Sequence, residues 1–268
     1  MQNPSDTGAA LRAQHAGGTG AIFGPKVRDY AASRPDYPAA LFEALAGWLP
    51  ARDARIADIG AGTGLLTAGL LARGWRVDAI EPNEEMRAAC DAWLGGRAGY
   101  RSQAGRAEAL PLAEGSLDLL TAAQAFHWFE IEAARAEALR VLKPDGAVAL
   151  IWNDRVIEAP LHRALDELFA EFGGAKRAAL LAHEERHEVP RFFGAARVEE
   201  RAWPHEHRLD AAGLEALVFS RSYMPAREGA AGRAVSAALA TLFAEFAAGA
   251  PTLGVPYRTV AMIGRPAA

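Results

Sequence analysis

Apolar residues in this chain follow two patterns that alternate along the sequence. Short apolar runs bounded by turn residues, which are typical of buried strands, lie at residues 54–59, 75–80, 117–123 and 147–152. Apolar residues at helical spacing fill the stretches between them, at 65–73, 83–94 and 132–142. A strand, a helix and a second strand in this order form a parallel crossover unit. The pattern therefore predicts an α/β fold built on a doubly wound, mostly parallel sheet.

The pattern changes after residue 155, where helices predominate. Apolar spacing predicts helices at 160–172, 175–183 and 211–219, followed by a long alanine-rich helix that ends near residue 250. Strands are predicted at 197–208 and 257–263. The segments 156–190 and 222–250 are too long for simple connections. We therefore expect them to form an α-helical lid over the edge of the sheet where ligands bind.

The chain before the first central strand contains two predicted helices, at 26–33 and 38–49. Pro38 suits the first turn of the second helix. Residues 1–24 are rich in Ala and Gly and are expected to form a flexible N-terminal arm. The sequence has 268 residues and no internal repeat, so residues 25–268 are predicted to form a single domain.

Charge and cysteine content narrow the class of protein. The 29 Lys and Arg residues against 33 Asp and Glu give a net charge of −4, which argues against a protein whose main task is binding nucleic acid. Cys90 is the one cysteine in the sequence, so a reducing compartment is expected. The N-terminus lacks a basic start before an apolar core, and Glu245 interrupts the apolar stretch near residue 250. We therefore expect a cytoplasmic protein that does not bind a membrane.

A glycine-rich turn follows the first central strand. The sequence Ala57-Asp-Ile-Gly-Ala-Gly-Thr-Gly-Leu65 has glycines at 60, 62 and 64. Glycine lets the backbone turn sharply and approach a ligand, and the N-terminus of the following helix favours a carboxylate or a phosphate. Asp58 is placed to accept a hydrogen bond from an ammonium group or a bound water. Leu65 stands where the dinucleotide-binding fingerprint has glycine.

Glu81 ends the second central strand. Neighbouring parallel strands end at the same edge of a sheet, so we expect Glu81 to lie close to the glycine turn. A carboxylate at this position accepts hydrogen bonds from the two hydroxyls of a ribose. The turn and Glu81 together therefore predict a site for a ribose-containing cofactor.

Four stretches make the chain resemble the class I S-adenosylmethionine-dependent methyltransferases, and within them the type-11 and trans-aconitate methyltransferase-like group. They are Asp-Ile-Gly-Ala-Gly-Thr-Gly at 58–64, Val-Asp-Ala-Ile-Glu-Pro-Asn at 77–83 with Met86, Gly-Arg-Ala-Glu-Ala-Leu-Pro at 105–111, and the segments 123–129 and 140–146. The resemblance covers about residues 25–155. It implies a Rossmann-like sheet of seven strands and S-adenosyl-L-methionine as the cofactor.

The resemblance also implies which residues hold the methionine part of the cofactor. The three glycines of the turn, Gly60, Gly62 and Gly64, would line it, with Asp58 near its ammonium group. Tyr30 and Arg34, from a Tyr-x-x-x-Arg-Pro-x-Tyr stretch, would clamp its carboxylate. Gln124, just past the third central strand, would lie beside the cofactor.

The nucleoside part of the cofactor is assigned in the same way. Glu81 would hold the ribose, and Asn83 and Met86 would flank the adenine. Ala107 and Glu108 would meet the edge of the adenine ring.

Candidate acceptor-binding residues are aromatic and basic. They are Tyr37, Trp128, Trp152, Arg155, Arg221 and Tyr223. Arg155, Arg221 and Tyr223 would suit an acidic acceptor. The open alternative is that these side chains lie at the surface and are solvated. His127 follows the strand at 117–123, where open α/β sheets bind ligands, and is a candidate general base. A structural histidine that supports the cofactor is the alternative.

Two further patterns are set aside. Residues 183–187 read His-Glu-Glu-Arg-His, which matches the zinc-protease pattern, but charged neighbours indicate a solvated helix end. No metal is therefore expected. The Asn/Asp-Pro-Pro-aromatic run typical of methyltransferases that act on nucleic-acid bases is absent from the sequence.

The sequence thus predicts an S-adenosylmethionine-dependent methyltransferase that acts on a small-molecule acceptor by in-line displacement. Holding the acceptor in line lowers the barrier by about 7–11 kcal/mol. Two alternatives stay open: a nicotinamide-dependent oxidoreductase, which Leu65 disfavours, and a catalytically inactive protein that binds S-adenosylmethionine. We expect no nucleic-acid or membrane partner, and a monomer or a homodimer.

Overall fold

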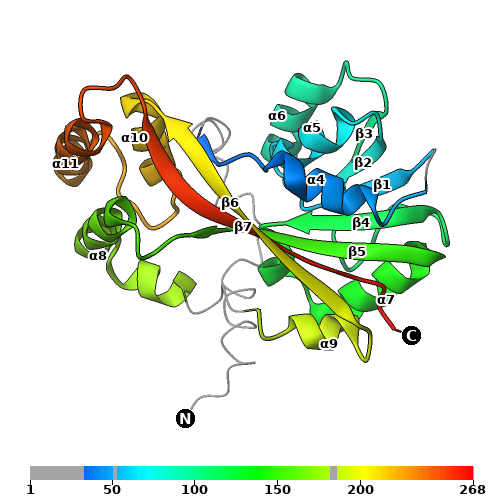
Figure 1. Cartoon of the computed structure of the whole chain (residues 1–268). Helices are drawn as coiled ribbons and strands as arrows, with labels where there is room; N and C mark the ends of the chain where they lie inside the picture. The colour runs from blue at the N-terminus through cyan, green and yellow to red at the C-terminus, as the bar shows by residue number, and fades with distance from the viewer. Residues whose placement is uncertain (1–32, 51–52, 182–185, 268) are drawn as a thin grey trace, which may run out of the picture.

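A computed structural model describes residues 33–50, 53–181 and 186–267, without the side chains of 175–181. Seven strands form one sheet in the order β3-β2-β1-β4-β5-β7-β6 (Figure 1). Strands β1 to β5 are parallel to one another, whereas β7 is antiparallel to both β5 and β6. The prediction of a doubly wound, mostly parallel sheet of seven strands is confirmed.

The strands of the sheet are β1 (Arg55–Ile59), β2 (Arg76–Ile80), β3 (Tyr100–Gln103), β4 (Leu117–Ala123), β5 (Leu142–Arg155), β6 (Val198–Leu209) and β7 (Leu253–Gly264). The helices are α4 (Ala39–Ala46), α5 (Leu65–Leu71), α6 (Glu84–Leu94), η2 (Phe126–Trp128), α7 (Ile131–Val141), α8 (Pro160–Leu181), α9 (Val189–Phe193), α10 (Ala211–Phe219) and α11 (Ala230–Ala247).

Two apolar clusters, one on each face of the sheet, form the core of the sheet region. Successive strand residues point to opposite faces, so Ile56 lies in the cluster under α4, α5 and α6, and Ala57 lies in the cluster with α7 and α9. Figure 1 shows these helices on opposite sides of the sheet. The continuous apolar runs in β1, β2, β4 and β5 are therefore explained by burial on both faces.

A third apolar cluster forms away from these two. It joins α8, α10 and α11 to the end of β6 and the start of β7. The β6–β7 pair runs in register from Val198↔Gly264 to Leu209↔Leu253, and β5 pairs with β7 only as far as Arg155↔Tyr257. The β6–β7 pair therefore projects beyond the sheet and carries the helices seen at the left of Figure 1. We call α8, α10 and α11 with this part of the strand pair the lid.

Several elements differ from their predicted form. Strand β3, at Tyr100–Gln103, was not predicted, because it is short and polar and lies at the sheet edge beside β2 alone. Strand β5 begins earlier than the run predicted at 147–152: it contains residues 143–146, and a register shift opposite Leu117 and Leu119 accommodates them. The helices predicted at 160–172 and 175–183 are joined as α8 at a non-helical Gly174.

The segment 156–190, predicted as lid, includes the start of α9. That helix packs instead against the sheet, in the cluster with α7. The predicted arm at 1–24 and nearly all of the helix predicted at 26–33 lie outside the described residues.

Helix α11 is long and apolar enough, by length and composition, to cross a membrane. It is the one such helix among the described residues. Val235 and Leu239 are buried in the third apolar cluster. These contacts account for its apolar face within the lid.

Candidate functional site

The turn after β1 has a backbone conformation that glycine adopts at little energetic cost. Gly60, Gly62 and Gly64 have φ angles of 67°, 57° and 94°, in the left-handed region that strains other residues. Neighbours also approach closely: a Cβ on Gly60 would come within 2.6 Å of the Ala125 Cβ, and one on Gly64 within 2.7 Å of the Cys90 Sγ. Glycine is therefore required at 60 and 64 by both conformation and space.

Glu81 lies directly against this turn. Its Oε2 accepts a hydrogen bond from the Gly62 N–H at 2.9 Å, and its Oε1 accepts one from the Asn83 N–H at 2.8 Å. Burial raises the pKa of Glu81, and these two backbone hydrogen bonds act in the opposite direction. Each carboxylate oxygen has two lone pairs, so each can accept one further hydrogen bond from a ligand. The proximity of Glu81 to the turn is thus present in the structure.

Asn83 and Met86 flank the turn from α6. The Asn83 Oδ1 accepts a hydrogen bond from the Met86 N–H at 2.9 Å, so Asn83 is the N-cap of α6. The Asn83 Nδ2 is buried and has no hydrogen-bond partner among the residues that the structure describes. The Met86 Sδ lies 3.7 Å from the position that a Cβ on Gly62 would take. A buried donor without a partner is unfavourable, which fits a position that a ligand completes.

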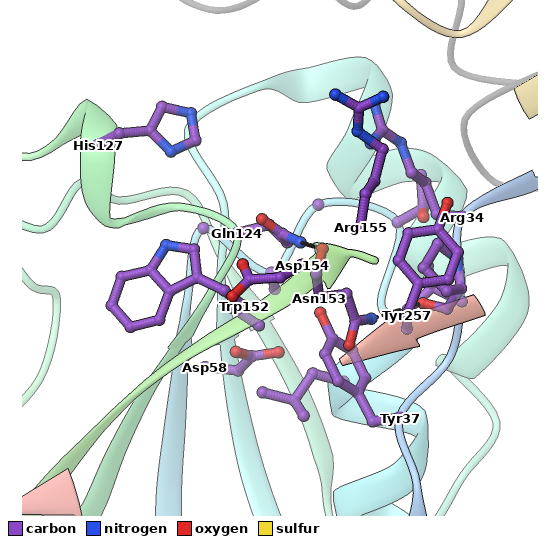
Figure 2. Close-up of a pocket in the computed structure, with 18 of the residues that line it drawn as sticks. Arg34, Tyr37, Asp58, Gln124, His127, Trp152, Asn153, Asp154, Arg155 and Tyr257 are labelled. Atoms are coloured by element: carbon purple, nitrogen blue, oxygen red, sulfur yellow. Dashed lines mark hydrogen bonds between the residues drawn. The ribbon is translucent and has the colours of Figure 1, made fainter. Parts of the chain in front are cut away.

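Asp58 lies at the base of a cavity, as Figure 2 shows. It is 1% exposed, and its carboxylate accepts hydrogen bonds from the Thr67 hydroxyl at 2.6 Å and the Thr121 hydroxyl at 3.0 Å. Burial raises the pKa of Asp58 to about 6, although the two threonine hydroxyls act in the opposite direction. At neutral pH Asp58 is therefore mostly ionised and places a negative charge under the cavity.

The cavity has a volume of about 500 Å³ and lies at the carboxyl ends of β1, β4 and β5, where open α/β sheets bind ligands. The predicted residues that line it are Arg34, Tyr37, Asp58, Gly60, Gly62, Gln124, His127, Trp152, Arg155, Arg221 and Tyr223. Figure 2 shows Arg34, Arg155 and Tyr257 close together on one side, with His127 and Trp152 on the other. Segments far apart in the sequence therefore meet at one cavity.

Gln124 has an unusual backbone conformation at the wall of this cavity. Its φ angle is 56°, which is uncommon for a residue other than glycine. Its N–H donates to the Ile151 C=O at 2.9 Å, and its Nε2 donates to the Asn153 C=O at 3.2 Å. Two hydrogen bonds to β5 thus hold the residue in a conformation that is often found at functional sites.

His127 and Trp128 have different surroundings although they are adjacent. Their rings lie 4.8 Å apart, tilted by 47°. His127 lines the cavity, whereas Trp128 packs against the apolar cluster with α7 and is not among the lining residues. Of these two candidates for the acceptor site, the structure therefore brings His127, and not Trp128, to the cavity.

Some predicted cofactor residues lie away from the cavity wall. Gly64, Glu81, Asn83 and Met86 are not among the residues that line it. Ala107 is 7% exposed and belongs to the core. The Glu108 Oε1 accepts a hydrogen bond from the Glu130 N–H at 2.8 Å, just before α7. Its contact with an adenine stays a prediction.

Tyr30, predicted to clamp a carboxylate together with Arg34, lies outside the described residues. Arg34 itself lines the cavity. Its backbone segment is held by Asn153, whose Nδ2 donates to the Pro35 C=O at 3.3 Å and the Asp36 C=O at 3.0 Å.

Asn153 was missed by the sequence prediction. Besides the two carbonyls before α4 and the Gln124 amide, it contacts β7, because its Oδ1 accepts a hydrogen bond from the Thr259 hydroxyl at 2.6 Å. Its partners lie 29 to 118 residues away in sequence. No local motif therefore marks Asn153, which becomes visible only once the β5–β7 pairing is known.

Three more charged or aromatic lining residues were missed, namely Asp154, Arg186 and Tyr257. Arg186 pairs with Asp154 and lies over the Trp152 ring, 4.4 Å from its centroid. Tyr257 is buried at the point where β7 leaves β5. Tyr257 and Arg186 add to the aromatic and basic residues that were predicted to bind the acceptor.

The part of the chain around the glycine turn matches a known family model. Residues 57–150 match the model of a methyltransferase domain. The chain is 36% identical over 201 residues to an uncharacterized methyltransferase of Mycobacterium tuberculosis, covering 75% of this chain and 76% of the relative. It is 30% identical over 204 residues to an uncharacterized methyltransferase-like protein of Schizosaccharomyces pombe, covering 75% and 78%.

Solved structures share the fold. A candidate type II methyltransferase from Anaeromyxobacter dehalogenans matches with a TM-score of 0.56 and 26% identity, covering 86% of this chain and 95% of that one. A candidate methyltransferase from an antibiotic biosynthesis pathway of Anabaena variabilis matches with a TM-score of 0.60, 21% identity and coverages of 86% and 98%. At 21% identity the second likeness shows the fold alone.

The chain therefore belongs to the methyltransferase family of these relatives. Its fold is that of the class I methyltransferases, whose cofactor is S-adenosyl-L-methionine. The residues around the turn fit this cofactor, because they offer the hydrogen-bonding capacity of Glu81, the buried Asn83 donor and the negative charge of Asp58. The family assignment argues against a nicotinamide-dependent oxidoreductase.

Proposed function

We propose that this chain transfers the methyl group of S-adenosyl-L-methionine to a small-molecule acceptor by in-line displacement. The observation that carries the proposal is the contiguity of two features. The glycine turn with Glu81 lies at the tips of β1 and β2, and the cavity beside it continues to aromatic and basic residues of the lid side. Such a cavity holds two ligands next to one another under a common cover.

The chain's own residues bind and orient the cofactor. Glu81 would accept hydrogen bonds from the ribose hydroxyls, and the Asn83 Nδ2 would donate to the adenine. Asp58, with its charge under the cavity, would pair with the ammonium group. Arg34 would bind the carboxylate, together with Tyr30. When bound, the cofactor supplies a methyl group activated by a positively charged sulfur.

Catalysis would come mainly from position. Acceptor and donor held at attack distance save about 7–11 kcal/mol of the barrier, and the buried walls of the cavity exclude water. Trp152, 7% exposed, and Tyr37 would form the apolar wall against the acceptor. His127 is the candidate base for an acceptor that must lose a proton. An acceptor that is already ionised would need no base.

The cavity limits the size of the acceptor. About 500 Å³ is within the range of single small-molecule sites, and here it also has to hold part of the cofactor. We infer a small molecule rather than a nucleic acid. We place the reaction in the cytoplasm, on a monomer or a homodimer.

The decisive measurement is binding of S-adenosylhomocysteine by isothermal titration. Glu81→Ala is expected to weaken binding by about 1–3 kcal/mol, because buried acceptors for the ligand are lost. Glu85→Ala is the matched control, since Glu85 is an exposed carboxylate nearby in α6, and it should bind like the wild type. Unchanged binding by Glu81→Ala would refute the role of Glu81, and no binding by the wild type would refute the proposed function.

A second measurement separates an enzyme from an inactive cofactor-binding protein. Radiolabelled S-adenosylmethionine is incubated with the chain and a panel of metabolites, and the label is followed into products. Transfer is expected to at least one compound. Cofactor binding without transfer to any compound would favour the inactive alternative.

A further inference from the structure

We propose that Thr67 and Thr121 are positioning residues for donor binding. Their hydroxyls hold the Asp58 carboxylate ionised at the base of the cavity, so that it pairs with the ammonium group of S-adenosyl-L-methionine and loses this pairing when the pH falls. This inference rests on the proposed function. It adds two residues to the donor site and a dependence of donor affinity on pH.

The fold brings one hydroxyl to each oxygen of the Asp58 carboxylate. Thr121 is the register partner of Asp58 on the neighbouring parallel strand β4, and its Oγ1 donates to the Asp58 Oδ1 at 3.0 Å. Thr67 lies in the first turn of α5, and its Oγ1 donates to the Asp58 Oδ2 at 2.6 Å. Both threonines are fully buried. Donors from two different elements therefore fix the carboxylate at both oxygens.

These donors are neutral, whereas the carboxylate that they hold is buried. Burial raises the pKa of Asp58 to about 6, and the negative charge of Glu81 acts in the same direction. The two hydroxyls and the Thr67 backbone N–H act in the opposite direction. A buried carboxylate beside neutral donors is stabilised further by a cation. Because Asp58 lines the cavity, a cationic group of a ligand can supply that charge.

The carboxylate has room for such a ligand. Its two oxygens offer about four lone-pair sites, and the two hydroxyls and the Thr67 N–H occupy three of them. An ammonium group can therefore donate to Asp58 without displacing either threonine. Figure 2 shows the carboxylate at the base of the cavity.

A purely structural role for the threonines is the competing explanation. The Thr121 Oγ1 also lies 3.3 Å from the Ala57 C=O, and a hydroxyl has one proton to donate. If it donates there, Thr121 stabilises the pairing of β1 with β4 and does not act on Asp58. The distance to Asp58 is the shorter of the two, and a hydrogen bond to an ionised acceptor is the stronger. The geometry thus favours Asp58 as the acceptor.

Other titratable groups have to be separated from Asp58. Glu81, after β2, and Cys90, on α6, interact electrostatically with it. Burial raises the pKa of Cys90 to about 11, so the thiol stays neutral below about pH 8. Glu81 can titrate as well, but in the proposed function it binds the ribose and not the ammonium group. The described residues of the cavity wall that are charged or titrate below about pH 8 are Arg34, His127, Asp154, Arg155, Arg186 and Arg221.

The first experiment measures the affinities of two ligands by isothermal titration at about pH 5, 7 and 8. S-adenosylhomocysteine has the ammonium group, whereas 5′-methylthioadenosine has the same adenine and ribose but lacks the amino-acid part. Titration of Glu81 affects both ligands, so the ratio of their affinities reports on the amino-acid part alone. In the wild type this ratio is expected to fall about tenfold from pH 7 to pH 5, because the ionised fraction of Asp58 falls by that factor.

Asp58→Asn assigns the change to this carboxylate. The variant should show a ratio that is nearly independent of pH, because no group that titrates is left under the ammonium. A ratio in the wild type that does not change with pH would overturn the proposal. A change that persists in Asp58→Asn would also overturn it, since another group of the cavity, such as His127, would then be responsible.

The second experiment removes the hydroxyls. Thr121→Val is expected to bind S-adenosylhomocysteine about fourfold more weakly at pH 7 and less than about twofold more weakly at pH 8, because Asp58 without this donor ionises at higher pH. Thr121→Ser keeps a hydroxyl and should bind within about twofold of the wild type at both pH values. If Thr121→Val fails to fold, Thr67→Val takes its place.

Ser220→Ala is the matched control. It also removes a buried hydroxyl, which donates to the Leu217 C=O in the lid, and it should change neither affinity. A loss in Thr121→Val that is equal at pH 7 and pH 8, or equal for the two ligands, would show that the threonines act only through the stability of the fold. Unchanged binding would likewise overturn the proposal.

The two levels of inference fail differently. If the wild type does not bind S-adenosylhomocysteine at any of these pH values, the proposed function is wrong. If it binds and the ratio of the two affinities is independent of pH, the proposed function stands and the role of Asp58 and its two threonines is wrong.

Discussion

The sheet and the lid both bury an apolar core, but they form the site in different ways. In the sheet, the site is formed mainly by backbone: three glycines with positive φ angles and a carboxylate bound to backbone N–H groups shape the turn. Toward the lid, the site is formed by side chains, because arginines and aromatic rings from several segments make up the cavity wall. Residues 57–150, which match the family model, belong to the sheet region and include none of the lid.

This difference suggests a division of labour. A site formed by backbone, like the glycine turn, depends on few side-chain identities beyond glycine. It therefore suits a cofactor that stays the same across a family. A wall of side chains at the end of β5 and after α10 changes with each substitution. We therefore expect the sheet to determine cofactor binding and the lid to determine which acceptor is used.

The largest effect is expected for Phe169→Ala, which should destabilise the lid and leave cofactor binding in the sheet region nearly unchanged. Removing this buried ring from the lid core should cost about 3–5 kcal/mol of lid stability. Because Phe169 belongs to the third apolar cluster alone, affinity for S-adenosylhomocysteine should change by less than about threefold. Hydrogen exchange along α8 and titration of the cofactor product measure the two quantities.

Phe192→Ala is the matched variant in the sheet core, since Phe192 is also 1% exposed. It should lower the stability of the sheet and weaken cofactor binding. Equal loss of cofactor affinity in both variants would contradict the division between sheet and lid.

The next effect concerns the glycine turn after β1. Gly60→Ala should destabilise the protein by about 2–5 kcal/mol, because it combines a left-handed backbone for alanine with a Cβ that lies 2.6 Å from Ala125. Gly74→Ala is the control, since its φ angle is 78° but a Cβ there would meet no atom within 4 Å. Urea unfolding should show strain alone for Gly74→Ala, about 1–2 kcal/mol. Equal losses would mean that close approach at Gly60 is unimportant.

A third effect depends on pH through Asp58. Its pKa in the folded protein is about 6, above the ordinary 3.8, so folding disfavours the ionised form. The stabilising contribution of the protonated group is complete below pH 3.8 and is lost as the pH rises through 6. Asp58→Asn should therefore gain about 3 kcal/mol relative to the wild type between pH 3.5 and pH 8. Urea unfolding at several pH values tests this, and a constant difference would show that Asp58 titrates normally.

The smallest effect tests the link between the N-terminal segment and the sheet. Thr259→Val removes the hydroxyl that donates to the Asn153 Oδ1 and should cost about 1 kcal/mol. Because Asn153 holds the backbone next to Arg34, affinity for the cofactor product should fall by a similar amount. Thr241→Val, at an exposed threonine in α11, should change neither quantity.

Local patterns were sufficient to predict most strands of the sheet and the proximity of Glu81 to the glycine turn. Continuous apolar runs mark strands that are buried on both faces, and the glycines with Glu81 mark the strand tips because each signal lies within a few residues. Strand β3 escaped prediction, since Tyr100–Gln103 is half-exposed and has no apolar run.

The lid side could be predicted only in part, because its site depends on contacts between distant segments. Arg155 and Arg221 were predicted candidates, but nothing in the sequence places both against Phe169. Tyr257 and Asn153 escaped prediction for the same reason. Glu108 also has a distant partner that its sequence context does not indicate, because its Oε1 accepts a hydrogen bond from the Glu130 N–H.

The position of β7 has a consequence for biosynthesis. Strand β6 is made before α10 and α11, but in the sheet it pairs with β7 alone, which follows those helices. A chain that emerges N-terminal end first therefore holds β6 without its neighbour until β7 leaves the ribosome. An unpaired strand of this length invites pairing with other chains. The nascent protein is thus most vulnerable to aggregation while α10 and α11 are being translated.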